Sequence, residues 1–200
     1  IMKLVDAAIS APNACNMQSW HFYVVTDKAV KAKLAEESAI AAWATTAPVM
    51  FVVCTDAKEI VARFGERAEN LFTVQDTAAA IENILLCAAD MGLGGCFMGA
   101  FNEKKFREIV GVKADPRPVA VVPVGTPAVE LPARPRNPID SVVTFVGDGA
   151  GEYRILFRII LPLSKLENGV SQCVIKGPIP IISGESVCIK RISSIIWSIV

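Results

Sequence analysis

The sequence has little of what a metal site or a nucleic-acid-binding surface requires. It contains a single histidine, His21, and none of its six cysteines belongs to a C-x-x-C pair. A zinc site needs clustered cysteine and histidine ligands, so we expect no zinc. Twenty Lys+Arg balance 20 Asp+Glu, which leaves no basic surplus to neutralise phosphates. We therefore expect no metal ion and no nucleic-acid partner.

The sequence also lacks the features of membrane, secreted and common nucleotide-binding proteins. It has no uninterrupted run of 18 apolar residues, so we expect no membrane partner. The first residues, IMKLVD, look like part of a helix and not a signal peptide. Scattered cysteines in apolar sequence are typical of reduced, buried thiols, which favours the cytoplasm. Neither G-x-G-x-x-G nor a P-loop is present, so a Rossmann or Walker site is not supported.

What the sequence does have is apolar content, and it is distributed in two parts. Hydrophobic residues make up 52% and charged residues 20%, which excludes an intrinsically disordered chain. Alanine falls from 25 residues in 1–148 to one in 149–200. We therefore predict a domain over 1–145 and an atypical tail over 146–200. The tail is either a genuine second module or, as we favour, an altered or frame-shifted end, and its lack of periodicity predicts poor order.

Hydrophobic periodicity in the first part predicts both helices and strands. The predicted helices are Ile1–Ser10, Lys28–Ile40, Val74–Met91 and Asn102–Val110, the last with Asn102 as N-cap and Gly111 after its end. The predicted strands are His21–Thr26, Val49–Thr55 and Pro118–Val124. These helices and strands mix without a strict βαβ alternation.

One candidate site is the segment Ala11–Trp20, between the first helix and the first strand. It carries Asn13, Asn16 and Gln18, whose carboxamides each supply a donor and an acceptor. Such groups suit the polar edge of a flavin. The alternative is a loop in which the asparagines only cap the backbone.

Two further segments are candidates for ligand contact. The first, Gly92–Phe101, has four glycines in eight positions, which leave backbone N–H groups open to a planar ligand. Its alternative is a simple turn between helices. The second contains Arg134 and Arg136 in a proline-rich loop, where two arginines held by rigid neighbours can grip a phosphate. Its alternative is a solvated surface pair.

Three blocks of sequence together resemble the nitroreductase family of FMN-dependent oxidoreductases. The run AAISAPNACNMQSWHFYVVTD is similar to the family's first block, except that Asn13 stands where serine is usual and Ser19 where proline is usual. QDTAAAIENILLCAADMGLGGCFMGAF resembles its central helix and flavin-facing loop, and VAVVPVGTPAVELPARPRNP its strand and basic loop. The blocks occur in the family's order. The family's arginine-rich segment would precede Ile1, so the chain is interpreted as a truncated member with an unrelated-looking tail.

The resemblance implies an α+β fold with a nitroreductase-like mixed sheet flanked by helices, in a homodimer with FMN at the subunit interface. Backbone N–H groups would face flavin N5 and O4, and arginines would hold the phosphate. The implied cofactor-binding residues are Pro12, Asn13, Ala14, Asn16, Gln18, Gly99, Ala100, Arg134 and Arg136. Hydride would pass from NAD(P)H through the flavin to a nitroaromatic, quinone or similar small-molecule acceptor, with no obligatory protein acid or base. The alternative is an inactive or truncated homologue that acts at most as a flavin-binding or dimerising module.

Other conspicuous residues have simpler interpretations. We expect Cys96 to be a small packed hydrophobe and Trp43 to be a core or interface anchor that could lie near the substrate opening. We expect His21 to be structural, and the cluster of Lys104, Lys105 and Arg107 to be a solvated helix face.

Overall fold

The computed structural model describes residues 1–113, 115–129, 134–144, 146 and 196–197, and all structural statements concern these residues. The chain divides into two units. Unit 1 contains Ile1–Glu130 and Ile195–Val200, and unit 2 contains Leu131–Ser194. Apart from Val146, Ile196 and Trp197, the tail predicted over 146–200 lies outside the described residues.

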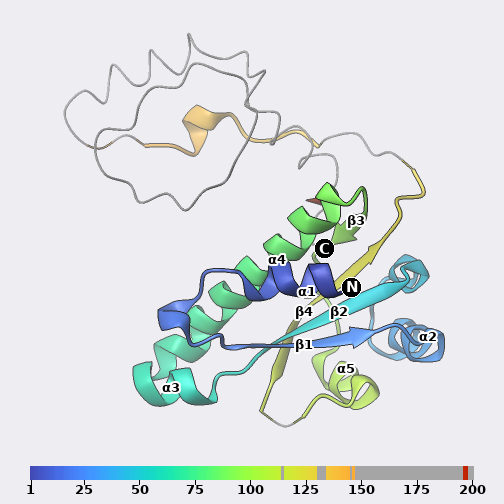
Figure 1. Ribbon diagram of the computed structural model, residues 1–200, viewed down its shortest axis with the longest axis horizontal. Coiled ribbons are helices and arrows are strands. Elements are labelled where there is room, and N and C mark those ends of the chain that lie inside the picture. Colours follow the sequence, from blue (N-terminus) through green and yellow to red (C-terminus); the bar gives the residue numbers. More distant parts are fainter. Residues whose placement is uncertain (114, 130–133, 145, 147–195, 198–200) are drawn as a thin grey trace. The chain divides into compact units, whose positions relative to one another are not determined.

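A mixed sheet forms the centre of unit 1 (Figure 1). Its strands, in spatial order, are β1 (Trp20–Val25), β2 (Val49–Thr55), β4 (Arg117–Gly125), β3 (Gly94–Cys96) and β5 (Ile196–Trp197). The first four strands pair antiparallel, and β5 pairs parallel with β3. All seven residues of β2 are buried, as expected of a central strand. The predicted α+β class is confirmed.

Helices cover both faces of this sheet. Helices α1 (Met2–Ile9) and α4 (Thr73–Asp90) lie on one face, and α2 (Lys28–Glu37) and α5 (Glu103–Val110) lie on the other (Figure 1). The sequence predicted these four helices, but it did not predict α3 (Lys58–Phe64) or the π-helical turn η3 (Ala68–Phe72) that leads into α4. Strand β3 was also missed, because its glycine-rich sequence was interpreted as a loop.

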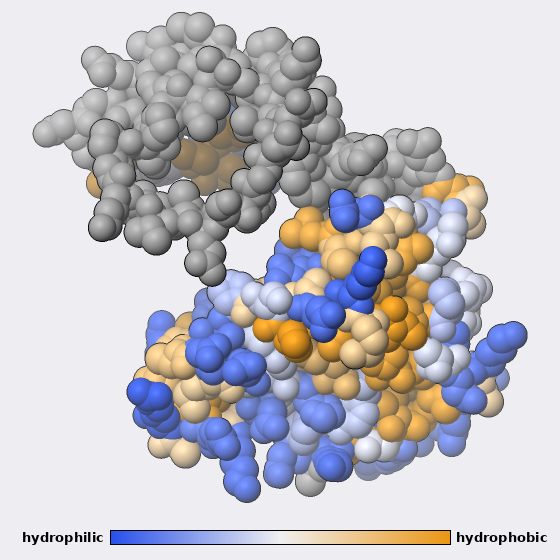
Figure 2. Space-filling model, in the orientation of Figure 1, coloured by the Kyte–Doolittle hydropathy of each residue, from blue (hydrophilic) through white to orange (hydrophobic). Residues whose placement is uncertain are grey.

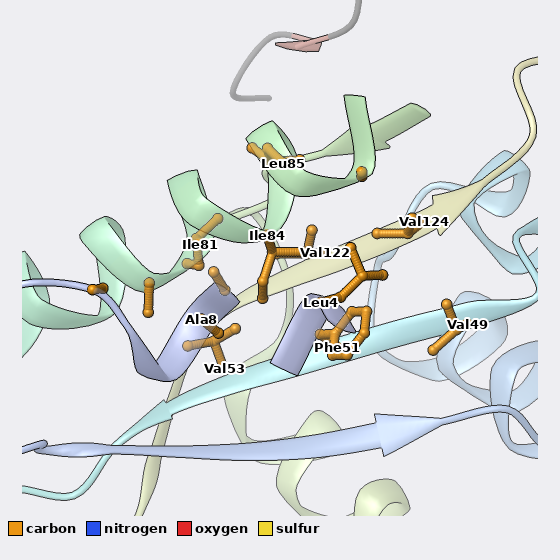
Figure 3. Close-up of a cluster of buried hydrophobic side chains, with 14 residues drawn as sticks. Leu4, Ala8, Val49, Phe51, Val53, Ile81, Ile84, Leu85, Val122 and Val124 are labelled. Carbon is orange, nitrogen blue, oxygen red and sulfur yellow. The ribbon is translucent and has the colours of Figure 1, made fainter. Parts of the chain in front are cut away.

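Each face of the sheet buries its own hydrophobic core. The first core joins α1, α4 and alternate residues of β2 and β4, and Figure 3 shows it. Its labelled members are Leu4, Ala8, Val49, Phe51, Val53, Ile81, Ile84, Leu85, Val122 and Val124. The second core lies under α2 and α5 and contains the alternate strand residues, such as Met50, Val52 and Val121. The period of two along β2 and β4 therefore supplies both cores.

The apolar side of helix α4 packs on the first core. Together with η3, it is the one segment of the described chain that is long and apolar enough to cross a membrane. The residues that make it apolar, such as Ile81 and Leu85, pack against the sheet and α1. Burial inside the protein therefore accounts for its length and composition.

Local signals set the ends of the helices. The Asn102 side chain accepts a hydrogen bond from the Lys105 N–H at 3.1 Å, and Gly111 follows α5 with a left-handed φ of 73°, both as predicted. Helix α2 ends at Glu37 and not at Ile40, because Ala39 adopts a φ of 62°. The expected end was three residues too late.

The prediction of a solvated cationic face on α5 was wrong for Arg107. Its guanidinium donates to the Pro116 carbonyl at 2.6 Å and to the Lys113 carbonyl at 2.7 Å. Arg107 therefore holds the turn between α5 and β4. Lys105 does lie at the surface, where it forms exposed ion pairs with Glu37 and Glu108.

Candidate functional site

The loop between α1 and β1 is closed by its own side chains. The Asn13 carbonyl oxygen Oδ1 accepts from the Gln18 N–H at 2.8 Å, and its amide Nδ2 donates to the Ala11 carbonyl at 3.3 Å. Asn13 therefore caps the backbone, which is the simpler alternative weighed for this loop. The side chain of Asn16 is exposed, and that of exposed Gln18 donates to the Asn16 carbonyl at 3.3 Å.

The backbone of this loop is strained. Cys15, Asn16 and Gln18 have φ values of 52°, 56° and 51°, in the left-handed region that favours glycine. Asparagine tolerates this region best of the three, because its short polar side chain bonds locally. Residues held in such conformations cluster at ligand-binding sites, where the surrounding structure enforces them.

Asp76 on α4 anchors this loop from the core side. Its Oδ1 accepts from the Ala14 N–H at 2.9 Å, and its Oδ2 accepts from the Ser19 hydroxyl at 2.8 Å. Asp76 is only 5% exposed. The sequence interpretation missed Asp76 and Ser19, although one signal was available. Asp76 occupies a position of the buried helical stripe that continues at Ala80, where a carboxylate is out of place unless it is bonded.

The glycines of the segment Gly92–Phe101 have different structural roles. Gly92 has a φ of 72° and follows α4, so it serves the end of the helix. A Cβ on Gly95 would lie 2.7 Å from Leu85 Cδ2, and a Cβ on Gly94 would lie 3.1 Å from Pro127 Cγ. These two glycines therefore permit close packing of β3. The prediction that all four glycines leave room for a ligand was wrong for them.

The end of this segment does remain open. After Met98, whose backbone pairs with Val121, Gly99 and Ala100 are both exposed. A Cβ on Gly99 would meet no atom within 4 Å. Within the described parts of unit 1, the N–H groups of Gly99 and Ala100 donate no hydrogen bond. They are therefore free to donate to a ligand.

The predicted phosphate-binding arginines belong to unit 2. The Arg136 guanidinium donates to the carbonyls of Arg134 and Pro135 at 3.2 and 3.4 Å, so it bonds to its own loop. Each unit is described by itself, and a phosphate-binding role for Arg134 and Arg136 stays a prediction.

The structure also shows the surroundings of Cys96, His21 and Trp43, which the sequence had singled out. Cys96 is buried, and burial raises the pKa of its thiol, which agrees with a packed hydrophobe. His21 is exposed on β1, its ring 4.7 Å from that of Tyr23. Trp43 is 55% exposed in η2 (Ala42–Thr46), which excludes the core alternative, and its role as an interface anchor stays a prediction.

Within unit 1, the predicted cofactor-binding residues lie in two segments. Pro12, Asn13, Ala14, Asn16 and Gln18 form one loop anchored to the first turn of α4. Gly99 and Ala100 lie between β3 and α5. No hydrogen bond joins the two segments in the described chain, and no group of three or more potential metal ligands occurs there.

Comparison with known proteins gives a consistent family. The model of the nitroreductase family matches residues 1–45 and 37–126. An Archaeoglobus fulgidus protein with the provisional name NADH dehydrogenase/NAD(P)H nitroreductase is 34% identical over 134 residues, which cover 65% of this chain and 74% of that protein. An FMN reductase [NAD(P)H] of Bacillus subtilis is 27% identical over 153 residues, covering 70% and 61%.

A solved structure supports the same assignment. A nitroreductase family protein from Clostridium novyi superposes with a TM-score of 0.56 at 31% identity, covering 63% of this chain and 72% of that one. The matched family model and this fold define an oxidoreductase of the nitroreductase type. The chain belongs to the nitroreductase family.

Proposed function

We propose that this protein is an FMN-dependent oxidoreductase that takes hydride from NAD(P)H and reduces nitroaromatic, quinone or similar acceptors. The observation that carries the proposal is the strained, exposed loop 12–18, which is anchored to the central helix and holds Asn16 and Gln18 at the surface. The FMN reductase named among its relatives supports the choice of cofactor.

The residues present fit the polar edge of a flavin. Exposed carboxamides on Asn16 and Gln18 can both donate and accept, as the pyrimidine ring and ribityl chain require. Gly99 and Ala100 are exposed, and a Cβ on Gly99 would meet no atom within 4 Å. Arg134 and Arg136 would hold the phosphate. FMN, when bound, supplies hydride transfer between nicotinamide and acceptor.

The chain's own residues would bind and orient the cofactor. Backbone N–H groups at Gly99 and Ala100 would stabilise negative charge on the reduced ring. No side chain is required as an acid or base. We further propose that the protein is a cytoplasmic homodimer in which loop 12–18 contributes to a flavin site shared between subunits.

FMN titration tests this proposal directly. We expect the protein to quench FMN fluorescence and to oxidise NADH or NADPH when menadione or nitrofurazone is added. Asn16→Asp, which keeps the side-chain shape but removes the amide donor, is expected to weaken FMN binding about tenfold. Asn70→Asp on η3 is the matched control, and we expect it to bind FMN like the wild type. A chain that leaves FMN fluorescence unchanged would contradict the proposal.

The second candidate function is a flavin-binding or dimerising module without activity. It is favoured by the Asn13 carboxamide, which bonds within its own loop through both Oδ1 and Nδ2. The same experiment separates the two functions, because such a module would bind FMN and leave NADH and NADPH unoxidised.

A further inference from the structure

The strained loop needs a restraint from outside itself. Cys15, Asn16 and Gln18 are non-glycine residues with left-handed φ, a conformation that costs free energy relative to relaxed backbone. The hydrogen bonds that side chains make within the loop, among them those from Gln18 to Asn13 and from Asn13 to Ala11, are exposed or half-buried. Water competes for such bonds, so they restrain the loop weakly.

Two tertiary hydrogen bonds from the loop end on one carboxylate. Asp76 accepts from Ala14, 62 residues away in sequence, and from Ser19, 57 residues away. Ala14 immediately precedes the strained residues and Ser19 immediately follows them. The backbone of Ser19 is also held at the sheet, because its carbonyl accepts from the Asp56 N–H at 3.1 Å. At Ala14, the hydrogen bond to Asp76 ties the loop to the protein core.

Burying a carboxylate at this position of α4 costs free energy unless hydrogen bonds compensate for it. A buried carboxylate loses its hydration and needs hydrogen-bond donors to compensate. Neighbouring buried positions of α4 hold Thr73 and Thr77, whose hydroxyls donate to carbonyls of the same helical segment. Asp76 bonds instead to the loop. The hydrogen bonds of Asp76 therefore hold the loop and not the helix.

We propose that Asp76 is a positioning residue, which holds loop 14–18 in its left-handed conformation and so orients the FMN-binding groups of this loop. The proposal rests on the proposed function for the identity of the ligand. Asp76 acts through Ala14 and Ser19 and need not touch the cofactor. With Asp76 in place the loop is ordered before the ligand arrives, which lowers the entropic cost of binding.

Substitutions at Asp76 have distinguishable consequences. Asparagine can still accept from Ala14 through Oδ1 and can donate to Ser19, because a hydroxyl rotates to become an acceptor. Alanine can do neither, and leaves the Ala14 N–H without its partner. Positioning therefore predicts a graded series, in which Asp76→Asn is mild, Ser19→Ala is intermediate and Asp76→Ala is severe.

The test combines hydrogen exchange of the apoprotein with FMN titration. In Asp76→Ala we expect faster amide exchange across residues 13–19 and an FMN dissociation constant raised about tenfold or more. Thr77→Val is the matched control. It removes a buried hydroxyl one residue away whose bonds stay in α4, so it is expected to lower Tm without changing loop exchange or FMN affinity.

Each outcome is decisive for one claim. Unchanged exchange at residues 13–19 in both Asp76→Ala and Ser19→Ala would overturn the anchoring role. Faster exchange with unchanged FMN affinity would overturn the positioning role. If Asp76→Ala does not fold, Ser19→Ala and Asp76→Asn give the same comparison. A wild-type chain that binds no FMN would overturn the proposed function, while the exchange data would still decide whether Asp76 anchors the loop.

Discussion

At the scale of single residues, the burial of Cys54 makes the stability of the protein depend on pH. It lies in β2 with 0% exposure, and burial raises the pKa of its thiol from 9.0 to about 12, with nearby Arg107 lowering it and Glu103 raising it by smaller amounts. The folded protein therefore keeps Cys54 protonated at pH values where the unfolded chain ionises. Unfolding then releases a proton, so stability is lost as the pH rises from about 9 to 12.

We therefore expect Cys54→Val to reduce the alkaline loss of stability. One such thiol changes the free energy of unfolding by at most about 1.4 kcal/mol per pH unit. Urea denaturation at pH 8.0 and pH 10.5 measures the difference in wild type and variant, which removes the contribution of other groups. Cys15→Ser, at an exposed position, is the control and should keep the wild-type dependence. Equal pH dependence in wild type and Cys54→Val would contradict this.

Lys31 is a buried cation that acts as a structural donor. Its side chain on α2 is 4% exposed, and Nζ donates to the Ala47 carbonyl at 2.6 Å and the Pro48 carbonyl at 3.4 Å. Lys31→Met would leave these carbonyls unsatisfied just before β2. We expect a loss of about 1–3 kcal/mol in the free energy of unfolding, measured by denaturant titration.

Lys33→Met is the control for this substitution on the same helix. Lys33 is exposed, and its ion pair with Glu37 spans 3.8 Å, so its removal should cost less than about 0.5 kcal/mol. Equal effects of the two substitutions would show that Lys31 does not stabilise this junction.

At the scale of secondary-structure elements, the spacing between β3 and α4 depends on Gly95. A Cβ there would lie 2.7 Å from Leu85 Cδ2, and Leu85 is itself buried in the first core. We expect Gly95→Ala to lower the free energy of unfolding by about 1–3 kcal/mol through overpacking, measured by thermal and urea denaturation. Gly99→Ala, where the added methyl meets open space, should leave stability unchanged. A neutral Gly95→Ala would show that the Leu85 side chain or α4 gives way, and would contradict the close-packing role of Gly95.

At the scale of the whole molecule, apolar side chains remain exposed on the face that carries α1 and α4. Figure 2 shows hydrophobic residues at the surface of unit 1 in the orientation of Figure 1. The exposed apolar residues of these two helices are Met2, Ile9 and Val74, with Ile1 and Met91 adjoining their ends. Such a face is suited to the proposed homodimer.

We therefore expect Val74→Glu to weaken dimerisation, because a charge would be buried in the subunit interface. Analytical ultracentrifugation should detect a shift from dimer to monomer, accompanied by weaker FMN binding. Val24 on the edge strand β1 is the matched control, since it is 40% exposed compared with 42% for Val74. Val24→Glu should leave the dimer intact. A monomeric wild type, or equal effects of both substitutions, would contradict this interface.

The sequence by itself determined the elements whose signals are local. The apolar stripe of α4, the continuous apolar run of β2 and the cap residues Asn102 and Gly111 act within one element, so their patterns could be interpreted without a structure. Residue type also singled out the carboxamide loop as a candidate, whereas Gly99 and Ala100 came from the family resemblance, and a binding role for both segments stays a prediction.

The tertiary structure decided everything that depends on partners distant in sequence. It directed the Asp76 carboxylate onto a loop about 60 residues away, reserved Gly95 for contact with Leu85, and turned Arg107 from a surface cation into a donor to two carbonyls. A sequence pattern shows that a position is buried or strained, but not which group meets it there. That information arises only when packing brings distant segments together, because hydrogen bonds and close contacts depend on distances in space.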